Sequence, residues 1–200
     1  MNLTSFSSNS KNTQFILLYV LGMKLKFKIT IIGDGMVGKT SLIRKFTKGS
    51  FKPDYLKTIG AQFSIFDQEV NEDKIRLLFW DIAGQVKFNF LRPSFYNRSD
   101  AAVIVYSLED NDLGKKSFNH IVDWYNDVLN YCPEIPIVIF ANKVDLEDHS
   151  NFDDSKIQKL VDTHDLLGYY KTSAKTGEGV DKAFNFIIEK LYNTYTSFES

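Results

Sequence analysis

The sequence has little of several features that mark particular classes of protein. Its only cysteine, Cys132, permits no internal disulfide and fits a reducing compartment, and we expect it to be structural. His120, His149 and His164 share no spacing suited to metal binding, which favours surface or helix-end positions for all three. The net charge of −1 argues against a broad basic surface for nucleic acid or anionic membranes.

The N-terminal residues, 1–22, are predicted to be an extension outside the folded domain. Met1–Thr13 is rich in Ser and Asn and is expected to be disordered, and the apolar Gln14–Gly22 is too short to span a bilayer. Three readings remain open: a start site assigned upstream of a true start at Met23, a helix that packs on the domain, or a weak membrane-surface anchor. Asn2 excludes N-myristoylation at that residue.

Residues 23–200 are predicted to form one domain, without repeats or linkers, and the hydrophobic content of 44% is enough for a full core. Within it, Gly33–Thr40 reads G-x-x-x-x-G-K-T between an expected strand, Lys26–Ile32, and an expected helix, Ser41–Phe46. Backbone N–H groups of such a loop surround a phosphate, and glycine lets the chain turn tightly at close approach. The pattern in this context predicts a nucleotide phosphate-binding loop.

The side chains at the end of this loop suit the rest of a nucleoside triphosphate. Lys39 is long enough to reach the β- and γ-phosphates. The Thr40 hydroxyl can hold Mg²⁺ at the N-terminus of a helix, whose dipole favours anions. The expected nucleotide contacts in this segment are Gly35, Met36, Val37, Gly38, Lys39, Thr40 and Ser41.

A second polar segment indicates which base is bound. Asn142–Asp145 follows the apolar run Ile135–Ala141, which is typical of a buried parallel strand, and ligands bind beyond the carboxyl ends of such strands. The Asp145 carboxylate can accept hydrogen bonds from guanine N1 and N2, whereas adenine would leave it unpaired, a discrimination of roughly 10⁴-fold or more. Asn142 can contact both the base and the phosphate loop, and the stem of Lys143 can pack on the ring face.

A third segment, Thr172–Gly177, follows another expected strand, Gly168–Lys171. The Ala174 backbone N–H can donate to guanine O6, and the expected nucleotide contacts here are Ser173, Ala174 and Lys175. Three such segments in order, each after a strand, favour a guanine-nucleotide site. An ATP-using phosphate-loop kinase is the rival enzyme class, and Asp145 argues against it.

Between these segments lie residues suited to metal binding and hydrolysis. Asp81 ends an alternating strand, Ile75–Trp80, and can hold Mg²⁺ through water, since Mg²⁺ keeps several waters and uses few protein ligands. Thr58 is the candidate for a further hydroxyl ligand, ordered by the γ-phosphate and released after hydrolysis. Gly84 can point its N–H at the γ-phosphate, and Gln85 can orient the attacking water.

Together these segments resemble the Ras superfamily of small GTPases, and most closely its Rab branch, over residues 24–195. Rab-like features are Thr58–Phe63, the Trp80 that precedes Asp81, and Phe95–Tyr96. The resemblance implies a P-loop NTPase fold and a Mg²⁺-dependent molecular switch that binds GTP and GDP and hydrolyses GTP slowly without an activating partner. It also implies exchange factors, activating proteins, effectors and a role in signalling or vesicle trafficking.

The resemblance also assigns roles to aromatic residues. It implies that Phe51 stacks on the guanine edge and that Tyr55 closes over the phosphates. It further implies that Phe63, Trp80 and Phe95 form the surface that partners read at the switch regions. From the residues alone these three could equally belong to the core, because aromatic side chains dominate both cores and interfaces.

Several features depart from the family pattern. Val86 and Lys87 stand where Rab proteins usually carry Glu-Arg, which affects the identity of the partner rather than the chemistry. Met36 replaces a small residue, and we expect its side chain to face solvent and to influence nucleotide exchange. Gly35 keeps room for Gln85 and for an arginine supplied by a partner. The sequence ends without a cysteine for a prenyl anchor, which leaves membrane contact open. We expect a cytoplasmic protein, with peripheral membrane contact through partners as an open alternative, and we expect it to be a monomer.

The order of expected elements predicts an α/β fold with a six-stranded, mostly parallel sheet, one antiparallel edge strand and helices on both faces. The antiparallel hairpin joins Ala61–Val70 to Lys74–Trp80 through Asn71–Asp73, and Ala101–Tyr106 is a further buried strand. Three apolar stripes at helical spacing are assigned to the core: Phe118, Ile121, Val122, Tyr125 and Leu129; Ile157, Leu160, Val161 and His164; and Val180, Ala183, Phe184, Ile187, Ile188 and Leu191.

The function predicted from the sequence is GTP hydrolysis by a molecular switch. The alternative is a GTP-bound interaction module that hydrolyses GTP negligibly. The presence of Gln85 and Gly35 argues against that alternative, because both suit the hydrolytic step.

Overall fold

The computed structural model describes residues 25–48, 61–84, 90–146 and 154–197. Its strands are β1 (Leu25–Ile32), β2 (Ala61–Val70), β3 (Asp73–Ile82), β4 (Ala101–Ser107), β5 (Ile137–Asn142) and β6 (Tyr169–Thr172). Its α-helices are α2 (Lys39–Phe46), α3 (Arg92–Tyr96), α4 (Asp112–Asn119), α5 (Ile121–Leu129), α6 (Asp154–Thr163) and α7 (Val180–Ser197). Among these helices, none is both long and apolar enough to cross a membrane.

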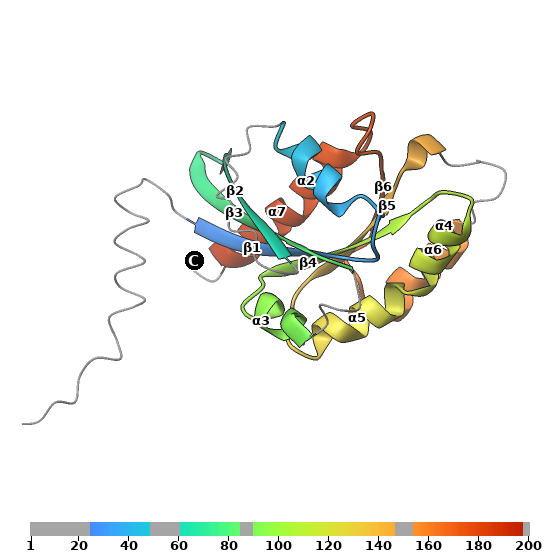
Figure 1. Cartoon of the computed structure of the whole chain (residues 1–200). Coiled ribbons are helices and arrows are strands. Elements are labelled where there is room, and N and C mark those ends of the chain that lie inside the picture. The colour runs from blue at the N-terminus through green and yellow to red at the C-terminus, as the bar shows by residue number, and fades with distance from the viewer. Residues whose placement is uncertain (1–24, 49–60, 85–89, 147–153, 198–200) are drawn as a thin grey trace, which may run out of the picture.

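The strands form one six-stranded sheet in the order β2-β3-β1-β4-β5-β6. β2 pairs antiparallel with β3, and every other neighbouring pair is parallel. The predicted mostly parallel sheet with one antiparallel edge strand is therefore confirmed. The chain leaves β1 toward α2 on one face and leaves β4 toward α4 and α5 on the other, so a ligand crevice is expected at the carboxyl ends of these two strands (Figure 1).

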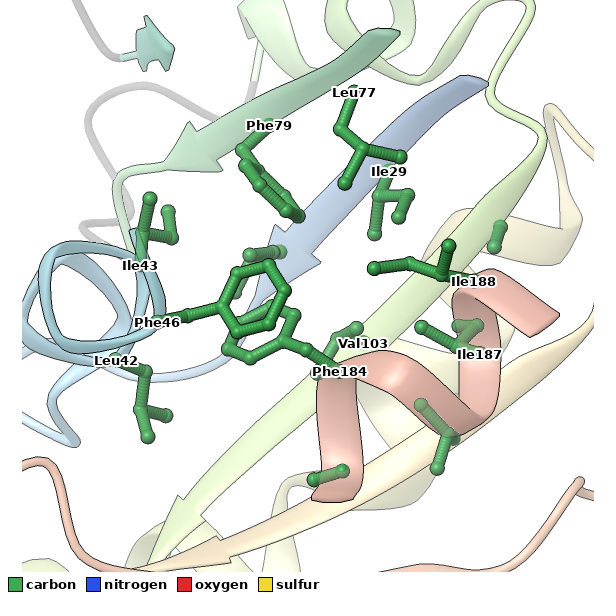
Figure 2. Packing of buried hydrophobic residues seen from close by; sticks show 14 of the residues in the cluster. Ile29, Leu42, Ile43, Phe46, Leu77, Phe79, Val103, Phe184, Ile187 and Ile188 are labelled. Carbon is green, nitrogen blue, oxygen red and sulfur yellow. The ribbon is translucent and has the colours of Figure 1, made fainter. Parts of the chain in front are cut away.

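Helices cover both faces of the sheet, as predicted (Figure 1). α2 and α7 lie on one face, where Figure 2 shows Phe46 beside Phe184 above β1 and β3. The two rings stack with centroids 4.5 Å apart, and Phe184 also meets Phe79 edge-on at 5.4 Å. All six predicted core residues of α7 are buried, and their packing positions α2 and the phosphate-loop segment that precedes it.

The opposite face is covered by α3, α5 and α6. On α6, Ile157 and Val161 are buried as predicted. The stripe that begins at Phe118 differs from the prediction, because the helix is interrupted at His120 and Phe118 belongs to α4. On α5 the buried residues are Ile121, Trp124 and Val128, whereas Val122, Tyr125 and Leu129 are only half-buried.

The hairpin between β2 and β3 is tighter than predicted. Asp73 already belongs to β3 and pairs with Val70, so Asn71 and Glu72 alone form the turn. Their φ angles are 48° and 70°, which is the positive-φ conformation that two-residue hairpin turns favour. At its other end β3 runs past Trp80 to Ile82, so the carboxylate of Asp81 is held by the strand itself.

Candidate nucleotide site

The phosphate-loop segment, Gly33–Thr40, joins β1 to α2 at the carboxyl edge of the sheet. Gly33 (φ 135°) and Gly38 (φ 101°) adopt conformations that residues with side chains rarely take. A Cβ at Gly33 would lie 2.1 Å from the Val105 carbonyl oxygen, and a Cβ at Gly38 would lie 2.3 Å from Asn142 Nδ2. The two glycines therefore let the loop approach β4 and β5 closely.

Met36 differs from the other residues of this loop. Its φ is 67°, although it is not glycine, and its side chain is 83% exposed, as predicted. A Cβ at the neighbouring Gly35 would meet no atom of the described residues within 4 Å.

Lys39, the first residue of α2, points back across the loop. Its Nζ donates hydrogen bonds to the carbonyl oxygens of Gly33 (2.8 Å) and Asp34 (2.7 Å). Burial lowers the pKa of Lys39 to about 8; the carboxylates of Asp81 and Asp34 oppose the shift, and Arg92 adds to it. The amine thus lies inside the loop, where it suits the oxygens of a polyphosphate.

Thr40 and Asp81, the two expected metal-binding residues that the structure describes, are in contact. The Thr40 hydroxyl donates a hydrogen bond to the Asp81 carboxylate. Burial raises the pKa of Asp81, while the Thr40 hydrogen bond and the charge of Lys39 oppose that rise. A hydroxyl and a carboxylate side by side fit Mg²⁺, which takes oxygen ligands and retains water.

Gly84 packs against the backbone at the start of the phosphate loop. A Cβ at this position would lie 2.4 Å from the Gly33 carbonyl oxygen and 2.6 Å from the Gly35 nitrogen, so the approach requires glycine. Gly84 is therefore beside the loop. The following predicted residues and segments lie outside the described part of the chain and stay predictions: residues 1–22, Phe51, Tyr55, Thr58, Gln85, Val86, Lys87 and His149.

Asn142, the last residue of β5, connects all three predicted segments. Its Nδ2 donates to the Val37 carbonyl oxygen at 2.8 Å, and its Oδ1 accepts from the Thr172 hydroxyl (3.3 Å) and the Ala174 N–H (3.2 Å). The expected tie between the base-binding segment and the phosphate loop is present. The Ala174 N–H, which is predicted to donate to guanine O6, donates in this structure to Asn142 instead.

The Asp145 carboxylate is positioned by the third segment. The Ser173 hydroxyl donates to its Oδ1 at 2.6 Å, and Lys175 Nζ lies 3.7 Å from its Oδ2. Lys143 has a positive φ of 71°, and its Nζ donates to the Glu109 carboxylate, a hydrogen bond that lowers the pKa of Glu109. Sequence reasoning missed Glu109, although its place just after β4 puts it at the same edge of the sheet.

Sequence reasoning also missed the contacts of Asp34 in the phosphate loop. His120 Nδ1 lies 2.9 Å from Asp34 Oδ2, and Trp124 Nε1 donates to Asp34 Oδ1 at 2.9 Å. His120 does lie at a helix end, as expected, but it also contacts the phosphate loop. No local pattern could signal this contact, because the partners are 86 and 90 positions apart in the sequence.

The remaining histidine and cysteine predictions agree with the structure where it describes them. Cys132 is buried, and its thiol donates to the Tyr96 carbonyl oxygen. His164 follows α6, and its ring packs against Tyr125 with centroids 4.6 Å apart. Among the described residues there is no cluster of three or more His, Cys, Asp and Glu that could hold a metal.

The aromatic residues Phe63, Trp80 and Phe95 form one contiguous group. The Phe63 and Trp80 rings stack across β2 and β3 with centroids 5.8 Å apart, and Trp80 lies 5.9 Å from Phe95. Phe95 is buried, so it belongs to the core rather than to an exposed surface. Phe63 and Trp80 are half-buried.

Comparison with known proteins matches residues 28–193 to the family described as the Ras family. The chain is 34% identical to Ras-related protein Rab-18-B of Danio rerio, over 86% of this chain and 82% of that protein. It is 35% identical to Ras-related protein Rab-18 of Lymnaea stagnalis, over 84% and 81% of the two chains. It is 33% identical to Ras-related protein Rab-30 of Homo sapiens, over 79% and 76%.

Proposed function

The chain belongs to the Ras family, within its Rab branch, and we propose that it uses the site described above as a GTP-operated switch in vesicle trafficking. Members of this family bind guanine nucleotides and Mg²⁺ and hydrolyse GTP, so the protein is a GTPase. A GTP-bound module with negligible hydrolysis is not favoured.

One observation carries the assignment of the site: the buried side chain of Asn142 contacts the phosphate loop through Val37 and the third segment through Ala174. A base held beside Asp145 and a phosphate held by the loop would then keep a fixed separation. This arrangement supports binding of a whole nucleotide rather than of a phosphate alone.

Within the proposal, the backbone of Gly35–Gly38 surrounds the β-phosphate and Lys39 neutralises charge on the β- and γ-oxygens. Gln85 orients the attacking water, and the Gly84 N–H faces the γ-phosphate. No general base with a tuned pKa is required, because phosphoryl transfer depends mostly on positioning and electrostatics. Hydrolysis is therefore expected to be slow until an activating protein supplies a further positive charge.

Mg²⁺ would be held by Thr40 and Thr58, with Asp81 acting through water, and when bound it neutralises negative charge on the phosphate oxygens. The guanine base would be read by Asp145, with Asn142 beside it and the Lys143 stem on the ring face. The remaining residues proposed to contact the nucleotide are Met36, Ser41, Phe51, Tyr55, Ser173, Ala174 and Lys175.

Partners of this protein are proposed to be an exchange factor, an activating protein and effectors, which contact the molecule near Phe63 and Trp80. These half-buried rings lie on the edge hairpin, and Lys28 Nζ sits 4.4 Å from the centre of the Trp80 ring. The buried ring of Phe95 packs against Trp80, with ring centroids 5.9 Å apart. We propose a monomer that reaches membranes through such partners.

The direct test is chromatography of the nucleotide released from purified, heat-denatured protein, followed by a single-turnover assay after loading with GTP and Mg²⁺. Bound GDP and slow conversion of GTP to GDP would support the proposal. Gln85→Leu should lose the accelerated turnover seen with an activating protein while retaining nucleotide affinity. Persistent bound GTP would favour the non-hydrolysing module, and adenine nucleotide in the pocket would refute the assignment of Asp145.

A further inference from the structure

We propose that Trp124 and His120 are positioning residues that hold the phosphate loop through Asp34, and that Arg92 connects this contact to α3. Nucleotide release would then depend on the position of α3, against which the ring of Trp124 is packed. This inference rests on the proposed function, because it concerns how the same site retains its nucleotide.

The first step of the argument is the environment of Asp34. Its side chain is only 14% exposed and receives two groups from the start of α5: the Trp124 Nε1–H at 2.9 Å and the His120 ring nitrogen at 2.9 Å. Residues four positions apart lie on one side of a helix, so both groups reach the carboxylate from the same direction. Hydrogen bonds to a charged acceptor are the stronger kind, so this contact fixes the first part of the loop.

The second step is that the phosphate loop is held at two places by side chains from other elements. Asn142 holds the Val37 carbonyl oxygen at 2.8 Å, and Trp124 with His120 holds Asp34. Met36 lies between these points with φ of 67°, a conformation that is unfavourable for a residue with a side chain. Such a conformation persists only when its surroundings fix it, so loss of one anchor should loosen the loop.

The third step is the far side of the Trp124 ring, where Arg92 lies. Arg92, the first residue of α3, is 9% exposed, and its guanidinium carbon is 4.0 Å from the centre of the Trp124 ring. Its Nη1 pairs with Asp127 at 3.0 Å, and the Tyr96 hydroxyl donates to the same carboxylate at 2.7 Å. Two residues of α3 thus bind one side of α5, beside the tryptophan.

These contacts form an unbroken series from Asp34 through Trp124 to Arg92. Arg92 is also a buried cation packed on Trp124, so its replacement by a neutral residue removes a positive charge from this region. A partner protein that displaces α3 would move Arg92 and the Trp124 ring together, and the hydrogen bond to Asp34 would weaken. The geometry therefore offers a route by which contact with α3 accelerates nucleotide release.

The test is the rate at which a fluorescent GDP leaves the purified full-length chain during a chase with excess GDP and Mg²⁺. Trp124→Phe removes the N–H donor and keeps an aromatic ring for Arg92, and it should speed release about tenfold. The matched control is Tyr125→Phe, at the next residue of α5. It removes a hydroxyl that donates a hydrogen bond to the His164 carbonyl oxygen at 3.4 Å, away from Asp34. Its release rate should stay within about twofold of the parent rate.

A double-mutant cycle tests the connection to α3. Arg92→Gln alone should speed release, partly through lost charge and partly through Trp124. In an Asp34→Ala background the hydrogen bond from Trp124 to Asp34 is already absent, so the effect through Trp124 is lost. Arg92→Gln should therefore increase the release rate by a smaller factor in that background than in the parent. Equal fold-changes in the two backgrounds would overturn the connection.

A purely structural role for Trp124 would lower the unfolding temperature of the GDP-bound protein without changing the release rate, and that result would overturn the inference. If the parent chain binds no guanine nucleotide, the proposed function fails instead. If the parent binds GDP and Trp124→Phe releases it at the parent rate, only the further inference fails.

Discussion

The hydroxyl of Thr40 donates a hydrogen bond to the carboxylate of Asp81, which joins the first turn of α2 to the end of β3 at the carboxyl edge of the sheet. The two oxygen groups come from segments 41 positions apart, and both belong to the set expected to hold Mg²⁺. Packing of α2 on the sheet through Phe46 and Phe79 keeps these segments in place (Figure 2).

The first prediction concerns removal of the metal. Chelation of Mg²⁺ should accelerate GDP release from the parent protein, and Asp81→Asn should release GDP faster even with Mg²⁺ present, since loss of an outer-shell ligand costs about 10–100-fold in metal affinity. Release rates measured with and without chelator should therefore differ less in the variant. Asp67→Asn, which breaks the Arg76 ion pair (2.8 Å) on the hairpin, is the control. Equal chelator effects in Asp81→Asn and the parent would remove Asp81 from the metal site.

A second prediction follows from Lys39, whose pKa is lowered by burial from 10.5 to about 8. Phosphate favours the charged amine, so the bound state should have the higher pKa. Above about pH 8, binding must then take up a proton, and GDP affinity should fall as the pH rises. Calorimetry or fluorescence titration between pH 7 and pH 9 measures this. Lys39→Met should bind more weakly and show a smaller pH dependence than the parent protein; the slope that remains comes from the other titrating groups, those of the nucleotide included.

The third prediction concerns the base. Xanthine carries a carbonyl group where guanine carries its 2-amino group, so Asp145→Asn can donate to xanthine but no longer accepts well from guanine. Affinity for GDP should fall at least about a hundredfold, and affinity for xanthosine diphosphate should rise. Ser173→Ala, which removes the hydroxyl that binds Asp145 at 2.6 Å, is the matched control. It should weaken GDP binding without favouring xanthosine diphosphate, and a preference for GDP kept by Asp145→Asn would exclude Asp145 from base recognition.

The parts of the site that could be predicted from the sequence are those encoded by neighbouring residues. Gly33–Thr40 and Asn142–Asp145 each carry their chemistry within a few positions, directly after an apolar strand. Because parallel strands end at one edge, local recognition of each segment was enough to bring them together. The Asp34 contacts with His120 and Trp124 could not be found in this way, because only the packing of α5 against the sheet creates them.

The prediction for α5 shows a different limit. Val122, Tyr125 and Leu129 recur at helical spacing, but so do Ile121, Trp124 and Val128, which are the residues that are buried. Periodicity predicts that a helix has an apolar side, whereas the neighbouring elements decide which of two adjacent stripes lies deeper. The interruption at His120 was missed for a similar reason, since apolar residues continue at compatible spacing on both sides of it.

A fourth prediction tests the core beneath α2. Phe184 is fully buried, and its ring meets Phe46 at 4.5 Å, Phe79 at 5.4 Å and Phe140 at 5.1 Å. Phe184→Ala should lower the free energy of unfolding by about 3–5 kcal/mol, because it removes these contacts and leaves a cavity. Urea unfolding of the GDP-bound protein measures this. The control is Phe186, a half-buried residue of the same helix whose ring, among the ring pairs of the described residues, contacts only Tyr170. Phe186→Ala should lower the free energy of unfolding clearly less than Phe184→Ala does.

The last prediction concerns the hairpin turn, where Glu72 has φ of 70° and Asn71 has φ of 48°. Asparagine tolerates positive φ, whereas glutamate adopts it at a cost and glycine adopts it freely. Glu72→Gly should therefore raise the free energy of unfolding by about 0.5–1 kcal/mol, in spite of the extra freedom that glycine gives the unfolded chain. Asn71→Gly should give a smaller gain, because the strain it relieves is smaller. A loss of stability in Glu72→Gly would mean that the Glu72 side chain contributes more to the hairpin than its backbone strain costs.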